Sequence, residues 1–248
     1  MIPTVSTAGW CLLVVAAIAV GIAKTALPGA ATLAVALFAA VLPARASTGT
    51  ILLLLLVADA VAITTYRRDA AWSSMRQLVP GVLAGVLLGA VFLGVAGDRV
   101  TKVFIGVLLL VLIAVTLLLM RRPRPPQVQG RVGRVVYGTL AGFTTMSANA
   151  GGPVMSMYLL ASEVAVTSFL GTSAWFFFLV NVVKLPFSVG LGVIRSETLW
   201  IDLVLAPVVL ASAYGGRLLA ARMDPDLFGR IVTVLTVLSS LYLVVSAF

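Results

Sequence analysis

The stretch 141-AGFTTMSANAGGPVMSMYLL-160 interrupts a chain that otherwise consists largely of Leu, Val and Ala. Small and hydroxylated residues fill its first half, Asn149-Ala150-Gly151-Gly152-Pro153 forms its middle, and the end turns apolar again. Glycine permits backbone conformations that are closed to other residues, and proline suits the first turn of a helix. The stretch therefore predicts two short helical segments separated by a non-helical break.

The composition around this break indicates the class of protein that carries it. Of 248 residues, 61% are hydrophobic and only 10% are charged, and the mean hydropathy is +1.16. Soluble domains carry about 25% charged residues, so a surface with so few charges must face lipid. We predict an all-α polytopic membrane protein.

The apolar stretches of the chain define the expected helices. Crossing the hydrocarbon takes about 20 helical residues, and six stretches are comfortably long enough. The first two stretches, and likewise the sixth and seventh, are short and meet at breaks that contain Gly and Pro. The stretches cover residues 8–23, 29–43, 47–66, 77–96, 100–120, 133–147, 153–166, 168–191, 199–221 and 226–247.

A basic, Pro/Gly-rich linker divides the chain into two halves that resemble each other. We predict a first transmembrane repeat over 1–122, a linker over 123–133 and a second repeat over 134–248. At an offset of 121 to 122 residues, 20–38 matches 141–159. Internal repeats are characteristic of secondary transporters. An offset of 122 also pairs Gly49-Thr50 with Gly171-Thr172 and Asp59 with Asn181. After a five-residue insertion, Pro80 pairs with Pro207 and Gly89 with Gly216.

Lys and Arg residues favour the cytoplasmic side of a membrane. If the linker is cytoplasmic, eleven basic residues lie on its side and four on the other. Each half then makes an odd number of crossings, so the two repeats are expected to have inverted topology. We expect a multi-pass protein of the cytoplasmic (inner) membrane, and both spanning and re-entrant short helices remain open.

The breaks predict a binding site. Non-helical backbone at membrane depth is tolerated only where protein or a water-filled cavity covers it. Helix N-termini that point into the breaks would present free N–H groups and a positive dipole end, which bind anions. We therefore expect a small anionic substrate near the membrane midplane. The expected substrate-binding residues are Lys24, Thr25, Gly29, Thr145, Ser147, Asn149, Gly151 and Gly152.

Three further polar residues, Asp59, Asn181 and Lys184, lie inside long apolar stretches. Ionisable residues at this depth cost free energy and are functional candidates by default. We therefore assign these three to coupling or gating. The alternatives are snorkelling to an interface for Asp59 and Lys184, and helix–helix hydrogen bonding for Asn181. Tight helix packing is likewise an alternative for the breaks.

Two other patterns have simpler interpretations. The spacing of Gly85 and Gly89 favours close helix packing. The acidic residues Glu197 and Asp202 are expected at solvated loop positions.

Several function classes are disfavoured. The chain has no histidine, no CxxC motif and no P-loop, so we expect no enzyme, no metal site, no cofactor and no ATP-driven transport. Lys24 is the one recognisable base for Ser147 or Ser156, so that an intramembrane Ser–Lys hydrolase is an alternative. The basic residues are scattered at segment ends, which argues against nucleic acid as a partner.

The stretches 21-GIAKTALPGAATL-33 and 141-AGFTTMSANAGGPVM-155, in halves joined by a basic linker, resemble the TauE/SafE family of sulfite-exporter-like permeases. Gly21-Ile-Ala-Lys24 is similar to the G-x-x-K-G start of one branch, with Thr25 in place of the second glycine. The resemblance implies secondary transport of sulfite, a sulfonate or a related anion, often outward. A coupling proton or Na⁺ and a homo-oligomer stay open, as do two alternatives, a non-transporting accessory subunit and an anion channel.

Overall fold

The computed structural model describes most of the chain up to the end of the ninth helix and a few positions beyond it. The described residues are 5–25, 30–66, 68, 70–120, 130–162, 166–220, 230, 234, 237–238, 241–242 and 244–247. Every regular element among them is a helix. The helices are α1 (Thr7–Thr25), α2 (Ala30–Val41), α3 (Ala44–Tyr66), α4 (Trp72–Val95), α5 (Asp98–Met120), α6 (Gly130–Ala148), α7 (Gly152–Ala161), α8 (Val166–Gly190) and α9 (Ser196–Ala220).

Six of these helices, α1, α3, α4, α5, α8 and α9, are long and apolar enough to cross a membrane. The prediction of an all-helical polytopic membrane protein is therefore confirmed. At 1.5 Å per residue, the 12 residues of α2 and the 10 of α7 reach only about 18 and 15 Å. The largest difference at a helix start is at α4, which begins at Trp72 and not at residue 77, and α6 begins at Gly130, inside the predicted linker.

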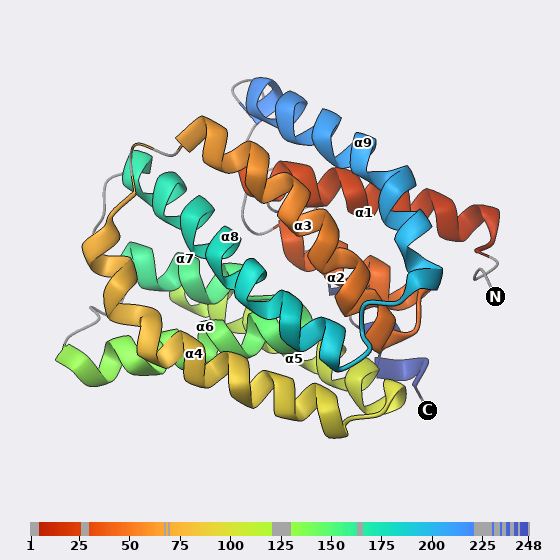
Figure 1. Ribbon diagram of the computed structural model, residues 1–248, viewed down its shortest axis with the longest axis horizontal. Coiled ribbons are helices and arrows are strands. Elements are labelled where there is room, and N and C mark those ends of the chain that lie inside the picture. The colour runs from red at the N-terminus through yellow and green to blue at the C-terminus, as the bar shows by residue number, and fades with distance from the viewer. Residues whose placement is uncertain are drawn as a thin grey trace.

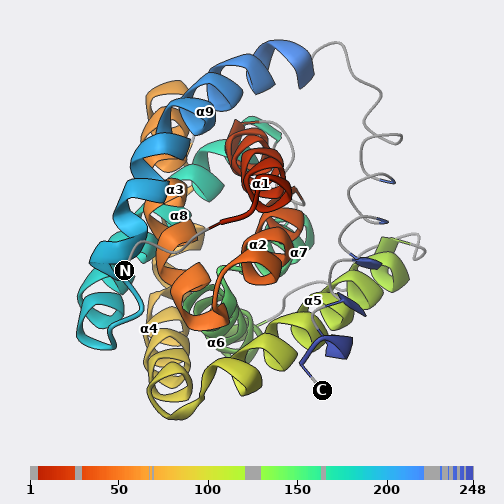
Figure 2. The same cartoon turned by 90° about the vertical axis from the view of Figure 1, so that its right-hand side faces the viewer.

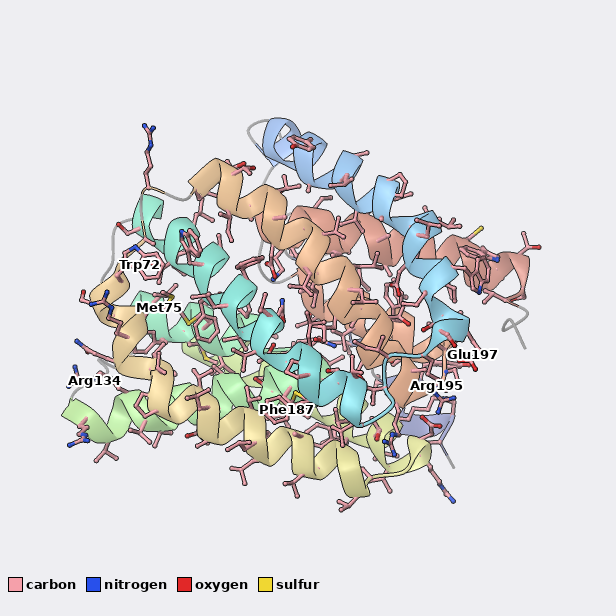
Figure 3. All side chains as sticks on the ribbon, viewed as in Figure 1. Trp72, Met75, Arg134, Phe187, Arg195 and Glu197 are labelled. Carbon is pink, nitrogen blue, oxygen red and sulfur yellow. The ribbon has the colours of Figure 1, made fainter. Side chains whose placement is uncertain are left out.

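The two ends of the bundle carry different residues. Arg134 lies at one end, which we call the linker end, and Arg195 and Glu197 lie at the other, which we call the far end (Figure 3). α1 and α2 form an antiparallel pair, because Gly9 near the start of α1 lies against Val41 at the end of α2. α6 and α7 form a second such pair, which the Tyr137–Tyr158 ring contact joins at the linker end.

Glycine faces allow two pairs of helices to pack closely and in parallel. A Cβ added to Gly85 of α4 would overlap the carbonyl oxygen of Thr139 in α6. In the same way, a Cβ on Gly21 of α1 would overlap Ser212 of α9. The packing interpretation of the Gly85–Gly89 spacing is thus confirmed, because Gly89 also lies against α6, at Met146.

α3 and α8 run side by side through the bundle, and α1 and α2 lie in the middle of the end view (Figures 1 and 2). At the far end, Arg45 at the start of α3 ties three segments together. Its backbone N–H donates to Asp98 Oδ1 at 2.9 Å, and its guanidinium donates to the carbonyl oxygens of Ala96 (3.1 Å) and Leu191 (3.2 Å). These contacts link the start of α3 to the connection between α4 and α5 and to the residue that follows α8.

Candidate functional site

The centre of the bundle holds an ion pair. Lys24 of α1 and Asp59 of α3 approach to 2.7 Å between Nζ and Oδ1, with side-chain exposures of 9% and 0%. The other carboxylate oxygen, Asp59 Oδ2, accepts a hydrogen bond of 2.7 Å from Asn181 Nδ2 of α8. Both oxygens of the buried carboxylate are thus occupied, as a charge away from water requires.

A second lysine lies next to this pair. Lys184 of α8 is 1% exposed, and its Nζ donates to three neutral oxygens. The acceptors are Asn149 Oδ1 at 2.6 Å, Asn181 Oδ1 at 3.2 Å and Thr145 Oγ1 at 3.3 Å. Since Asn181 also donates to Asp59, its amide joins the two charged centres into one buried cluster.

Asn149 marks the break between α6 and α7. Its φ is 52°, in the left-handed region, and its N–H donates to the carbonyl oxygen of Thr145 at 2.9 Å. Asparagine is, after glycine, the residue that best tolerates this conformation at a helix end. Asn149 Nδ2 donates to the carbonyl oxygen of Thr48 at 2.8 Å, which leaves Oδ1 facing Lys184.

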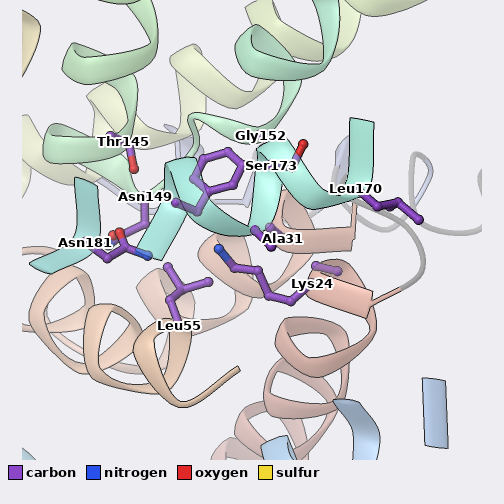
Figure 4. Close-up of a pocket in the computed structure, with 12 residues that line it drawn as sticks. Lys24, Ala31, Leu55, Thr145, Asn149, Gly152, Leu170, Ser173 and Asn181 are labelled. Atoms are coloured by element: carbon purple, nitrogen blue, oxygen red, sulfur yellow. The ribbon is translucent and has the colours of Figure 1, made fainter. Parts of the chain in front are cut away.

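A small cavity of about 30 Å³ lies against the cluster (Figure 4). The Lys24 ammonium reaches it and lies 4.3 Å from the centroid of the Phe177 ring. Because Gly152 lines the cavity and begins α7, the positive end of that helix also faces it. The lining residues are Ala23, Lys24, Ala31, Leu55, Thr145, Asn149, Gly152, Leu170, Ser173, Ala174, Phe177 and Asn181.

The formal charge around the cavity is positive when Lys184 is protonated. Two ammonium groups, Lys24 and Lys184, then accompany one carboxylate, Asp59, and the other polar atoms are neutral. Cations and a helix N-terminus that converge on a cavity attract an anion. Among the described residues, no three His, Cys, Asp or Glu side chains are placed to share a metal ion.

The structure brings half of the eight predicted binding residues together at the cavity. Lys24, Thr145, Asn149 and Gly152 all line the cavity. The three residues assigned to coupling or gating, Asp59, Asn181 and Lys184, belong to the same cluster. Their burial also rules out the alternative in which Asp59 and Lys184 snorkel to an interface.

Three other predicted binding residues, Thr25, Ser147 and Gly151, do not line the cavity. Thr25 Oγ1 donates to the carbonyl oxygen of Gly21 at 3.1 Å, and Ser147 Oγ donates to that of Phe143 at 2.6 Å. Gly151 packs closely against Thr145, because a Cβ added to it would lie 2.9 Å from the Thr145 Cβ. Gly29 lies outside the described residues.

One sequence expectation about a charged residue is wrong. Asp202 was expected at a solvated loop position, but it lies inside α9 and is only 8% exposed. α9 begins at Ser196 and packs against α1 and α3, so that this helix and its neighbours cover the carboxylate.

Sequence analysis did not identify two residues that contact the site. Phe177 belongs to the apolar run Phe176–Phe178 and carries no polar signal, although its ring meets the Lys24 ammonium. Thr48 contributes its backbone carbonyl oxygen to Asn149, and side-chain identity cannot reveal that contact. The pairing of Lys24 with Asp59 was also missed, although both residues were singled out individually.

Comparisons with known proteins identify the family of the chain. Neither the curated proteins nor the solved structures gave a match. The model of the family described as sulfite exporter TauE/SafE matches residues 13–243, which is nearly the whole chain and includes every residue of the cluster. The chain therefore belongs to the TauE/SafE family, a family of sulfite-exporter-type membrane transporters and not of enzymes.

Proposed function

We propose that this chain is a secondary transporter that exports a small organosulfur or related anion, such as sulfite or a sulfonate, across the cytoplasmic membrane. The observation that carries the proposal is the Lys24 ammonium in a buried cavity. The anion would contact Lys24, the N-terminal turn of α7 at Gly152, and the polar groups of Thr145 and Asn149. Each of these supplies a positive charge or a hydrogen bond that an anion can use.

We further infer that the two halves of the chain are inverted repeats and that access alternates by rocking of one against the other. Support comes from the Asn181–Asp59 hydrogen bond, because these residues are 122 positions apart and are paired by the repeat offset. The parallel packing of α1 on α9 and of α4 on α6 also supports inverted repeats. In each pair, the first helix of one proposed repeat lies along the fourth helix of the other.

The position of the cavity indicates from which side of the membrane substrate would enter in this conformation. Its lining includes Leu170 and Ser173, near the start of α8. That start lies at the linker end, where Thr172 Oγ1 accepts a hydrogen bond from the Ala71 N–H. Arg45 holds the far end closed. With a cytoplasmic linker, this is the conformation that receives substrate from the cytoplasm.

The test is anion flux in proteoliposomes. The purified chain is reconstituted, and uptake of sulfite, thiosulfate, methanesulfonate and acetate is measured against protein-free vesicles. We expect saturable uptake of at least one sulfur oxyanion and acceleration by the same anion on the opposite side, which indicates a carrier. Flux that stays linear with concentration and shows no such acceleration would indicate a channel, and no flux of any anion would contradict the proposal.

A further inference from the structure

Lys184 is a buried lysine that makes no direct contact with a carboxylate. Its side chain is 1% exposed, and all three acceptors of its Nζ are neutral oxygens. The nearest acid, Asp59, already uses Oδ1 for Lys24 and Oδ2 for Asn181. Lys184 therefore meets this carboxylate only indirectly, through the amide of Asn181.

The helices packed against α8 bring no further acid to Lys184. α3 contributes Asp59 as its one acid, and Lys24 of α1 faces the same carboxylate. α4 carries only Arg76, in its first turns, and the one titratable side chain of α7 is Tyr158, whose hydroxyl donates to the carbonyl oxygen of Ser74. A protonated Lys184 thus leaves the cluster with one positive charge in excess.

The three partners of Lys184 can satisfy both of its protonation states. Asn149 and Asn181 each donate through Nδ2 to another acceptor, so that both Oδ1 atoms face Lys184. An ammonium donates three hydrogen bonds, to these two oxygens and to Thr145 Oγ1. A neutral amine donates two, to the same amide oxygens, and accepts one from the rotated Thr145 hydroxyl. Lys184 can therefore gain or lose a proton without leaving a buried polar group unpaired.

Lys184 lies directly behind the wall of the cavity. All three of its acceptors line the cavity, although Lys184 itself does not. A proton can pass through the Thr145 hydroxyl, which both donates and accepts. An anion in the cavity would balance the excess positive charge, and a protonated Lys184 would in turn favour the anion. Linkage makes the two binding events mutually stabilising.

Taking the proposed anion transport as given, we propose that Lys184 takes up a proton when a monovalent anion enters the cavity and releases it when the anion leaves. The proton comes from water on the side to which the cavity is open, adds to the lone pair of Nζ, and returns to water on the other side. The transported unit is then one anion with one proton. Transport is electroneutral and favours monoanions over dianions.

The experiment measures proton and anion movement in the same vesicles. Proteoliposomes that contain a pH-sensitive dye receive an inward gradient of methanesulfonate, a monoanion that does not titrate near neutral pH, with the membrane potential clamped at zero. For the natural sequence we expect acidification of the lumen by about one proton per methanesulfonate ion. Methanesulfonate uptake without acidification would overturn the coupling proposal and leave anion transport standing.

Variants assign the proton to its site. Lys184→Met is expected to reduce anion-driven acidification at least tenfold, whereas Lys102→Met, a change at a lysine of α5 outside the cluster, should retain it. Lys184→Arg keeps a fixed charge, so that measurable anion exchange without net acidification is expected. Acidification that survives in Lys184→Met but disappears in Asp59→Asn would place the proton on Asp59 and overturn the assignment.

Discussion

Lys24 and Asp59 compensate each other's buried charge, so that removing either residue alone destabilises the protein. Breaking a buried ion pair by removing one partner costs about 3–5 kcal/mol, because the remaining charge has no compensation. Removing both charges costs much less. Stability and transport can therefore be separated experimentally at this position.

We predict that Lys24→Met lowers the free energy of unfolding by about 3–5 kcal/mol. The double variant Lys24→Met/Asp59→Asn should recover most of that loss while remaining inactive in transport. Thermal unfolding in detergent, followed by intrinsic fluorescence, measures the first effect, and the flux assay measures the second. Equal stability of Lys24→Met and the natural sequence would show that the pair is not buried as described.

Asn149 combines a strained backbone with two side-chain hydrogen bonds. Its left-handed φ of 52° costs an ordinary L-residue about 1–2 kcal/mol. Its side-chain amide forms hydrogen bonds with the Thr48 carbonyl oxygen and the Lys184 Nζ. Asn149→Ala loses both the tolerance of the left-handed conformation and the side-chain hydrogen bonds, whereas Asn149→Gly loses only the hydrogen bonds. We predict that melting temperatures fall in the order natural sequence, Asn149→Gly, Asn149→Ala. An alanine variant as stable as the glycine variant would contradict the backbone contribution.

The helices themselves could be predicted from sequence, but their side-chain contacts could not. Hydropathy over about 20 residues indicates a membrane span regardless of where the neighbouring helices lie. Gly151-Gly152-Pro153 indicates a break through local backbone preference alone. Lys24 and Asp59 were each recognised as expensive in lipid. Their pairing depends on the relative rotation and depth of α1 and α3, which no local pattern encodes. The same holds for Lys184, which reaches the α6–α7 break only through the packing of α8.

The glycine face of α4 provides a test at the level of helix packing. A methyl group at Gly85 would overlap the backbone of α6, whereas nothing lies within 4 Å of an added Cβ at Gly215 of α9. We predict that Gly85→Ala destabilises the protein by about 1–3 kcal/mol, and that Gly215→Ala changes its stability by less than about 1 kcal/mol. Thermal unfolding of the two variants side by side checks this. Similar melting temperatures would mean that α4 and α6 do not pack through this face.

Across the whole molecule, Arg45 is the residue expected to hold the far end closed. Removing its contacts with Ala96, Asp98 and Leu191 should favour the conformation that opens there. In a Cys11→Ser background, a cysteine at Ser47, which is 2% exposed, reports on opening through its rate of maleimide labelling. We predict that Arg45→Ala raises this rate several-fold and that Arg131→Ala, at the linker end, does not. An unchanged rate would contradict the closing role.

The central claim is that the Lys24 ammonium holds a transported anion in the bundle. The most direct measurement compares initial rates of sulfite uptake into proteoliposomes for the natural sequence, Lys24→Met and Lys102→Met, each verified as folded by size-exclusion chromatography. Loss of a charge-assisted contact worth at least about 1.4 kcal/mol lowers the rate tenfold or more. We predict that loss for Lys24→Met and near-natural uptake for Lys102→Met, and full uptake by a folded Lys24→Met variant would contradict the account.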